Sequence, residues 1–281
     1  MARQSNVLGN SPFFSKLTDY YALVPSAVLI RTAEAELLRT LPIEPPALDL
    51  CCGDGFFASL IHPSGFEAGC DFNETALCRA TARNAHKKLV CADITQAIPF
   101  PDGHFNTVVS NSSLEHVQNI DSVLQETARV LRPGGKLYTT FASYYAYEWW
   151  PNGQQALDHY MNYQPVYNWF PLDEWQRRMN SAGLRIIDHQ YYLSKRASRI
   201  FLFLDYHLSR IYLTSDPTLA SPLVSRMRQN PTQGWGATWR RLFTTASKKL
   251  FAAIWKGSFA RVTIRTGDEG GGILITAERV A

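Results

Sequence analysis

Short apolar runs of strand length alternate with amphipathic segments of helix length between residues 47 and 141. A strand covered on both faces is continuously apolar, whereas a helix repeats its apolar positions every three to four residues. The pattern predicts strands over 47–52, 66–71, 88–92, 105–111 and 136–141, with helices over 73–85 and 121–131 between them. Strands that alternate with helices are typical of an α/β protein whose parallel sheet is covered on both faces.

The flanking regions carry different patterns. Residues 11–41 have helical periodicity with a break at Pro25, and prolines at 42, 45 and 46 end the helix before the first strand. Ten aromatic residues crowd the segment 143–170. Beyond it we predict a helix over 171–182, a strand over 184–193, a hinge at Gly270–Gly272 and a final strand over 273–280.

Composition is that of a globular protein, with 46% hydrophobic and 19% charged residues. The five cysteines, at 51, 52, 70, 78 and 91, show no CxxC spacing, so we expect core residues in a reducing compartment and no metal site. Met1–Leu17 has no apolar core of signal-peptide length, and the densest apolar run, Ile200–Leu204, is too short to span a bilayer. These observations predict a cytoplasmic protein.

The net charge of +4 hides an asymmetry. The segment 195–265 holds thirteen Lys and Arg but only two acids, a net +11, while the rest of the chain carries −7. Within it, residues 238–256 repeat apolar side chains at helical spacing between basic ones. Such a helix either lies on an anionic membrane surface, which would place the protein at the inner membrane face, or packs on the core with a solvated basic face.

The sharpest local signal is the turn after the first strand. Residues 47–56 read ALDLCCGDGF, and Asp71 ends the next strand 20 residues after Cys51. Small residues let the backbone approach a ligand, and an acid at the second strand end accepts hydrogen bonds from ribose hydroxyls. The arrangement predicts an adenosine-containing cofactor without saying which one.

Later segments narrow the choice among adenosine-containing cofactors. Cys91-Ala92-Asp93-Ile94 ends the third strand, Ser110–Val117 (SNSSLEHV) leaves the fourth, and Arg132-Pro133-Gly134-Gly135 precedes the fifth. With these motifs in order, residues 47–141 resemble the class I S-adenosylmethionine-dependent methyltransferases, in the branch that includes ubiquinone and menaquinone methyltransferases.

That resemblance implies a Rossmann-like, doubly wound sheet of seven strands, mostly parallel with the last antiparallel. We divide the chain accordingly into an N-terminal helical cap (1–46), the cofactor-binding core (47–194, with an aromatic substrate cap at 143–170), a basic helical insertion (195–268) and a final core strand (269–281).

The resemblance also implies roles for individual residues toward S-adenosylmethionine. The methionine part lies over the turn, the ribose on Asp71, the adenine against Phe72 and beside Asp93, the sulfonium near the fourth strand end, and an N-terminal tyrosine closes the site. The residues so assigned are Tyr20 or Tyr21, Asp49, Cys51, Gly53, Gly55, Asp71, Phe72, Asp93, Ile94, Asn111 and Ser112. Two positions depart from the family pattern: Cys51 replaces the first glycine of the turn, and Asn106 replaces an acid.

Several assignments have alternatives. Asp71 could instead cap a helix, and Asp93 could form a turn. Methyl transfer is an in-line displacement that needs alignment more than a base. If a base acts, we expect His116 or Glu115, although His116 could also be a polar group at a loop junction.

The acceptor must be inferred from outside the motifs. The aromatic segment 143–170 could form a pocket for a flat or apolar molecule or simply pack a cap. We expect a small-molecule or lipid-like acceptor (isoprenoid, quinone or lipid-linked), with nucleic acid less favoured because no RNA-binding module is present. Two other classes stay open, an NAD-dependent oxidoreductase with the same turn and a non-catalytic membrane adaptor. The oligomeric state is not predicted.

Overall fold

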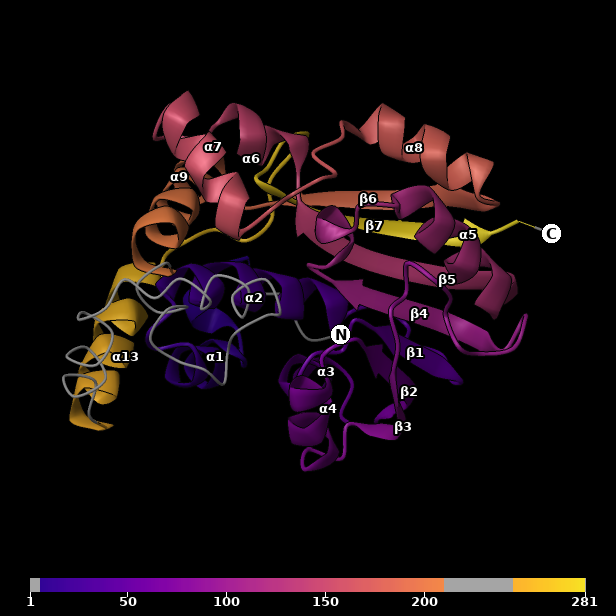
Figure 1. The fold of residues 1–281 in the computed structure, drawn as a ribbon. Coiled ribbons are helices and arrows are strands. Elements are labelled where there is room, and N and C mark those ends of the chain that lie inside the picture. The colour runs from indigo at the N-terminus through magenta and orange to yellow at the C-terminus, as the bar shows by residue number, and fades with distance from the viewer. Residues whose placement is uncertain (1–5, 210–244, 281) are drawn as a thin grey trace. The chain divides into compact units, whose positions relative to one another are not determined.

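The structure is a computed structural model that describes residues 6–209 and 245–280 (Figure 1). Its contacts divide the chain into two units, each built from three segments. The sheet unit comprises Leu37–Tyr145, Val166–Tyr191 and Gly272–Ala281. The helical unit comprises Met1–Glu36, Ala146–Pro165 and Tyr192–Gly271. The boundaries predicted at 46, 194 and 268 are a different division, made from sequence, and stay predictions.

The sheet unit contains one seven-stranded sheet with the order β3-β2-β1-β4-β5-β7-β6. Its strands are β1 (Ala47–Leu50), β2 (Phe66–Asp71), β3 (His86–Cys91), β4 (Phe105–Asn111), β5 (Leu131–Ala142), β6 (Leu184–Tyr192) and β7 (Gly272–Arg279). Neighbours from β3 to β5 pair in parallel, whereas β7 runs antiparallel to β5. The predicted doubly wound α/β fold with an antiparallel last strand is confirmed.

Helices cover both faces of this sheet (Figure 1). They are α3 (Phe56–Ile61), α4 (Glu74–Thr81), η2 (Leu114–His116), α5 (Ile120–Val130) and α8 (Leu172–Ser181), while α6 (Tyr144–Glu148) crosses the unit boundary. The central strands are accordingly buried along almost their whole length; every residue of β1 is buried. Trp175 of α8 packs on Phe141 of β5 with ring centroids 4.5 Å apart, in the middle of the core.

Several element boundaries differ from the sequence prediction; the helix predicted over 73–85, for example, ends at Thr81. β3 begins at His86 rather than Lys88, because Phe66 of β2 already pairs with His86. The predicted turn at 133–135 is an irregularity inside β5, since the pairing with β4 shifts between Phe105–Leu131 and Thr107–Lys136. Gly134 takes a left-handed φ of 75° there.

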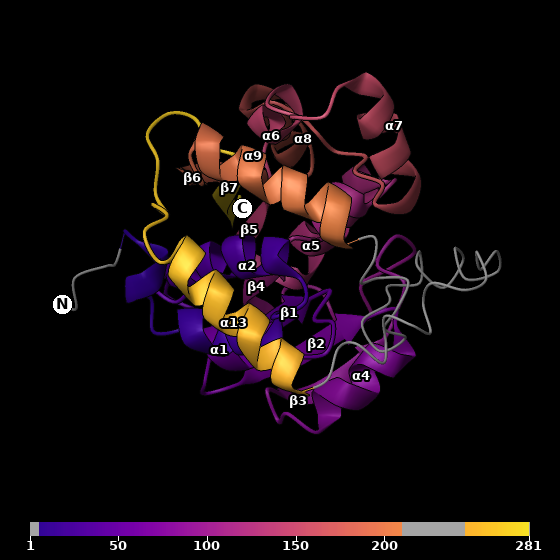
Figure 2. The same ribbon diagram turned by 90° about the vertical axis from the view of Figure 1, so that its left-hand side faces the viewer.

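The helical unit is assembled from η1 (Leu8–Asn10), α1 (Phe14–Tyr20), α2 (Pro25–Leu38), α7 (Gln154–Tyr163), α9 (Lys195–Leu204), η3 (Asp205–Ser209) and α13 (Thr245–Phe259) (Figure 2). The break predicted near Pro25 is confirmed, because α1 ends at Tyr20 and Pro25 opens α2. Asp205 joins three parts of this unit: it accepts hydrogen bonds from Ser26 (2.8 Å) and from the Tyr160 hydroxyl (2.7 Å).

The basic segment is described only in part. Residues 245–256 belong to α13, while 238–244 of the predicted stripe lie outside the described residues. Phe251, Trp255 and Phe259 of α13 stack along one side, and the Trp255 indole donates to the Ala22 carbonyl at 2.8 Å. Among the described helices, none has the length and hydropathy needed to cross a bilayer.

The predicted hinge at Gly270–Gly272 is replaced by close packing. All three glycines are buried, and a Cβ on Gly270 would lie 2.6 Å from the Tyr192 carbonyl oxygen. A Cβ on Gly271 would collide with the Ser198 side chain. Gly270 and Gly271 are therefore explained by close approach of the backbone.

Candidate functional site

The turn after β1 is built from left-handed residues. Cys51, Gly53 and Gly55 have φ angles of 62°, 56° and 72°. A Cβ on Gly53 would meet nothing within 4 Å, whereas one on Gly55 would press on Ala80 at 3.2 Å. Gly53 thus leaves its backbone open to a ligand, and Gly55 lets α3 start close to α4.

Asp71 ties this turn to the end of β2. One carboxylate oxygen accepts from the Gly53 backbone N–H and the other from the Asn73 N–H, both at 2.9 Å. Burial raises the pKa of Asp71, opposed by those backbone hydrogen bonds and assisted by the charge of Asp49. Helix capping is done by Asn73, whose side chain accepts from Ala76 N–H, so Asp71 is not the cap. A carboxylate has about four lone-pair sites, so capacity for further donors is left on Asp71.

A second acid lies beneath the turn. The Asp49 carboxylate of β1 is hydrogen-bonded to His86 Nε2 at 2.8 Å, and the His86 side chain is fully buried with its ring stacked on Phe66. Ligand atoms of Asp49, Cys52 and His86 lie within 4.8 Å of one another. The Asp49–His86 distance is that of a hydrogen bond, and burial raises the pKa of the Cys52 thiol far above its ordinary value. We interpret the group as a hydrogen-bonded pair beside a neutral thiol.

Residues predicted for the adenine divide into three environments. Phe72 is 55% exposed, so its ring is accessible for stacking. Ile94 is buried in the hydrophobic core at 6% exposure. Asp93 is exposed, and its Oδ1 accepts from both the backbone N–H and the hydroxyl of Thr95. The turn role considered for Asp93 is therefore present in the structure, and its adenine role stays a prediction.

The end of β4 is fastened to β5. Asn111 donates through Nδ2 to the Thr140 hydroxyl, and Ser112, at φ 45°, donates its N–H to the Thr140 carbonyl at 2.8 Å. The next residue, Ser113, donates to the Asn111 carbonyl at 3.0 Å. Ser113 also hydrogen-bonds the Cys51 thiol, which lowers a pKa that burial raises well above its ordinary value. The predicted residues Cys51, Asn111 and Ser112 are thus brought together through Ser113.

The base candidates occupy the short helix η2. Glu115 is 3% exposed, and His116 Nε2 lies 3.9 Å from its Oε1. The Glu115 carbonyl accepts from the backbone N–H groups of Tyr167 and Asn168, and Asn168 Nδ2 donates to the Leu114 and Val117 carbonyls at 2.7 Å. The loop at 166–168 therefore holds η2 in place. The catalytic roles of Glu115 and His116 stay predictions.

Sequence reasoning missed His86, Thr140 and Asn168. Each lies far along the chain from its partner, and only the strand register or a returning loop brings it to the site. Tyr20 and Tyr21 form an edge-to-face pair at 4.8 Å at the end of α1. They belong to the helical unit, as do the aromatics of 146–165, so their placement over the cofactor stays a prediction.

The family match to known proteins falls within the sheet unit. Residues 48–139 match the family described as "Methyltransferase domain". The chain is 30% identical over 139 residues to a demethylmenaquinone methyltransferase of Bacillus cytotoxicus, covering 44% of this chain and 58% of that protein. One from Bacillus cereus is 28% identical over 137 residues with the same coverage. The chain thus spans less than two thirds of the length of these relatives.

Solved structures show a similar fold at low identity. An S-adenosylmethionine-dependent methyltransferase from Thermotoga maritima matches with a TM-score of 0.54 and 14% identity, over 95% of this chain and 97% of that one. A geranyl diphosphate C-methyltransferase from Streptomyces coelicolor, solved with S-adenosyl-L-homocysteine, matches at 0.50 and 15%, over 89% and 77%. At sequence identities this low, the similarity supports the fold alone.

Proposed function

We propose, from the class I methyltransferase domain at residues 48–139, that this protein transfers a methyl group from S-adenosylmethionine to a small, apolar acceptor. The observation that carries the proposal is the Gly53–Asp71 arrangement. An open glycine backbone and a buried carboxylate meet at the carboxyl ends of β1 and β2, where α/β sheets bind their ligands.

The residues present fit the cofactor. The space above Gly53 would admit the methionine part, the remaining lone pairs of Asp71 would accept from ribose hydroxyls, and the exposed ring of Phe72 would cover one adenine face. When bound, S-adenosylmethionine supplies a methyl group already activated on a sulfonium. The chain must then align an acceptor with that group.

Alignment is the main contribution of the protein in this proposal. Orientation of two reactants can lower a barrier by ~7–11 kcal/mol. Asn111 and Ser112, locked to Thr140, would form a rigid floor at the end of β4 where the reacting groups meet. His116 would hold the acceptor proton on its imidazole, and the buried Glu115 carboxylate nearby would stabilise the imidazolium.

We further propose a quinone-like or isoprenoid acceptor. Two observations support it: the relatives named above methylate demethylmenaquinone by their names, and one fold neighbour is named for geranyl diphosphate. In the sheet unit, Tyr145 and Tyr191 pack edge to face at 5.5 Å, and burial raises the pKa of Tyr191. These rings belong to or pack against the hydrophobic core, so the proposal of a flat or apolar acceptor rests on the two names.

Calorimetry with S-adenosylmethionine tests the cofactor. Asp71→Ala removes the ribose acceptor, and the loss of hydrogen bonds to a charged group predicts affinity weakened by about 100-fold. Asp188→Ala, which removes an exposed acid of β6 in the same unit, is the matched control and should bind as the wild type. Equal affinity of both variants would remove the ribose assignment. Binding of a nicotinamide cofactor without S-adenosylmethionine binding would instead favour an oxidoreductase.

A further inference from the structure

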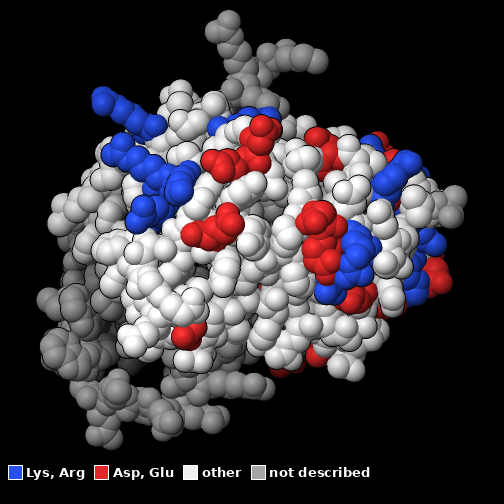
Figure 3. Space-filling model, turned by 90° about the horizontal axis from the view of Figure 1, so that it is seen from above, with Lys and Arg blue, Asp and Glu red and all other residues white. Residues whose placement is uncertain are grey.

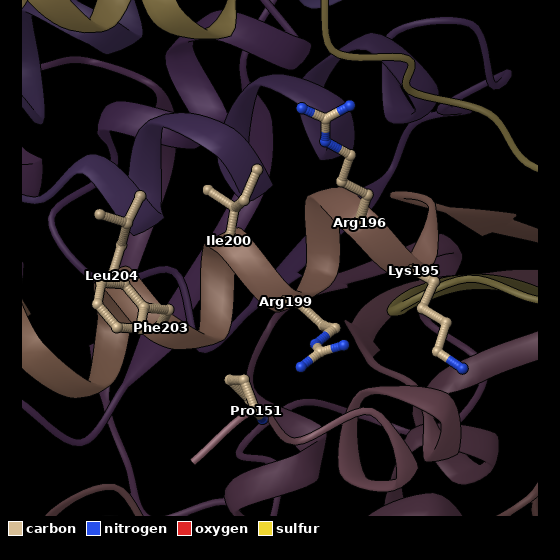
Figure 4. Close-up of a pocket in the computed structure, with 7 residues that line it drawn as sticks. All are labelled: Pro151, Lys195, Arg196, Arg199, Ile200, Phe203 and Leu204. Atoms are coloured by element: carbon tan, nitrogen blue, oxygen red, sulfur yellow. The ribbon is translucent and has the colours of Figure 1, made fainter.

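Helix α9 of the helical unit carries two parallel rows of side chains with the same order of chemistry. One row is Lys195, Arg199 and Phe203, and the other is Arg196, Ile200 and Leu204 (Figure 4). Each row repeats every four residues and so follows the helix axis. Both rows begin with cations and end with apolar side chains, so charge and hydrophobicity are separated along α9.

These rows are accessible. Ile200 is 38% exposed and Phe203 is 50% exposed, and both line a cavity of about 650 Å³ together with the three basic side chains and Pro151 (Figure 4). Opposite them, Ala197, Ser198 and Leu202 are buried and anchor α9. The exposed side chains of the two rows therefore lie on the side of α9 that faces away from these buried anchors.

The cations of α9 are not neutralised within the described chain. Arg196 and Arg199 take part in no ion pair with a described residue, and Lys195 lies over the Trp149 ring at 5.6 Å. Elsewhere on the protein some arginines are paired with acids, as Arg177 is with Glu174 and Arg178 with Asp121. Seen from above, the surface carries blue side chains among red ones at the right and a group of blue side chains at the upper left (Figure 3). Within 193–204 no acid is present. Three exposed cations that form no ion pair with a described residue favour an anionic partner.

Helix α13 adds a second surface of the same kind to this unit. Phe259 is buried and Trp255 is hydrogen-bonded to Ala22, whereas Leu250 is 61% exposed and Ile254 is 43% exposed, next to the exposed Lys249. A backbone hydrogen bond links the segments that flank the two helices: the N–H of Leu193, before α9, donates to the carbonyl of Ile264, beyond α13. Both helices lie on the side of the unit that faces the viewer in Figure 2.

We propose that the exposed rows of α9, continued by Leu250 and Ile254 of α13, dock the protein on an anionic lipid bilayer. Cations at one end would meet lipid phosphates, while Phe203 and Ile200 would enter the acyl boundary. A phosphorylated soluble ligand or a nucleic acid would use the cations, but it would leave the large apolar side chains exposed to water. The presence of both chemistries in each row is what selects a lipid surface.

The test is sedimentation of the whole chain with vesicles of phosphatidylcholine, with and without phosphatidylglycerol. We expect binding only to the phosphatidylglycerol vesicles, and release at high salt. Arg196→Gln with Arg199→Gln should weaken binding about 25-fold, from a factor of about five for each cation. Ile200→Ser with Phe203→Ser should weaken it about tenfold.

Matched controls come from the sheet unit. Lys87→Gln with Lys88→Gln removes the same charge from exposed positions of β3, and Ile187→Ser with Val280→Ser removes comparably exposed apolar side chains. Both controls should sediment as the wild type does. The proposal is overturned if the wild type stays in solution with phosphatidylglycerol at low salt, or if the α9 variants and the controls bind alike.

A result in which only one of the two α9 variants loses binding is also informative. If only the arginine pair matters, the protein binds the lipid headgroups through charge alone, and the proposed entry of Phe203 and Ile200 into the acyl boundary is wrong. Vesicle binding is measured without cofactor or acceptor, so its failure leaves the proposed methyl transfer untouched.

Discussion

Gly69→Ala is a severe test of how the cofactor turn is supported. Gly69 is buried in β2, two residues before Asp71. An added Cβ would lie 2.7 Å from His86 Cδ2 and 3.0 Å from both His86 Nε2 and Cys52 Sγ. Carbon atoms pack best at about 3.5–4.0 Å, so the imidazole would have to move by most of an ångström. It cannot move freely, because Nε2 is bonded to Asp49 and the ring is fully buried.

The cost follows from these contacts. Overpacking a filled core typically destabilises by about 1–3 kcal/mol. Displacing His86 also weakens a hydrogen bond to a carboxylate, which is worth about 1.5–3 kcal/mol. Together they predict a loss of about 2–5 kcal/mol, or a fall in Tm of about 3–9 °C for a chain of this size. Because Asp49 and Cys52 flank the turn, affinity for S-adenosylmethionine should fall as well.

Thermal unfolding followed by circular dichroism measures this effect, with calorimetry for the cofactor. Gly257→Ala in α13 is the control, since a Cβ there meets nothing within 4 Å. Alanine is favoured over glycine inside a helix by about 1 kcal/mol, so this variant should melt at or above the wild-type temperature. If Gly69→Ala melts together with Gly257→Ala, the tight Asp49–His86 support is refuted.

Three further predictions concern single side chains. Cys51→Gly should keep cofactor affinity and change Tm little, because removing the strain of a left-handed non-glycine residue, about 1 kcal/mol, offsets the packing that is lost. Cys51→Val should melt at a clearly lower temperature than the wild type. Equal melting temperatures of the two variants would contradict this reasoning. Hydrogen bonding to Arg129 lowers the pKa of Glu126, so its carboxylate stabilises the fold above pH 4.5 and this contribution disappears as pH falls through the lowered pKa. Glu126→Gln should therefore flatten urea-unfolding stability over that acid range, and a wild-type slope would count against it. His116→Gln should lower kcat by about 10²–10⁴ without changing cofactor Kd if His116 is the base, and unchanged turnover would remove that role.

Much of the fold could be read from local patterns. Continuous apolar runs identified the strands because both faces of the sheet are covered, and Pro25 marked a helix start because its ring suits the first helical position. Errors came where a pattern had two physical causes. The glycines at 270–272 suggested a hinge, but tight backbone packing also demands glycine, and the structure shows that packing.

The candidate site was predictable only along its backbone. Gly53, Asp71, Asn111 and Ser112 sit at strand ends, and parallel strands bring those ends to one edge. Their partners were not predictable. Asn168 reaches η2 across 54 residues, and His86 reaches Asp49 across 37, through contacts that no local pattern encodes.

By itself, the sequence determined the α/β alternation, the glycine-bearing turn after β1 and the acid at the end of β2, because periodicity and backbone preference act over a few residues. Tertiary structure alone decided that Asp71 holds Gly53, that His86 supports Asp49, and that the two rows of α9 face outward while its other side is buried. Those facts depend on strand register and on which helix face finds a partner, and both are set by packing between segments distant in the chain.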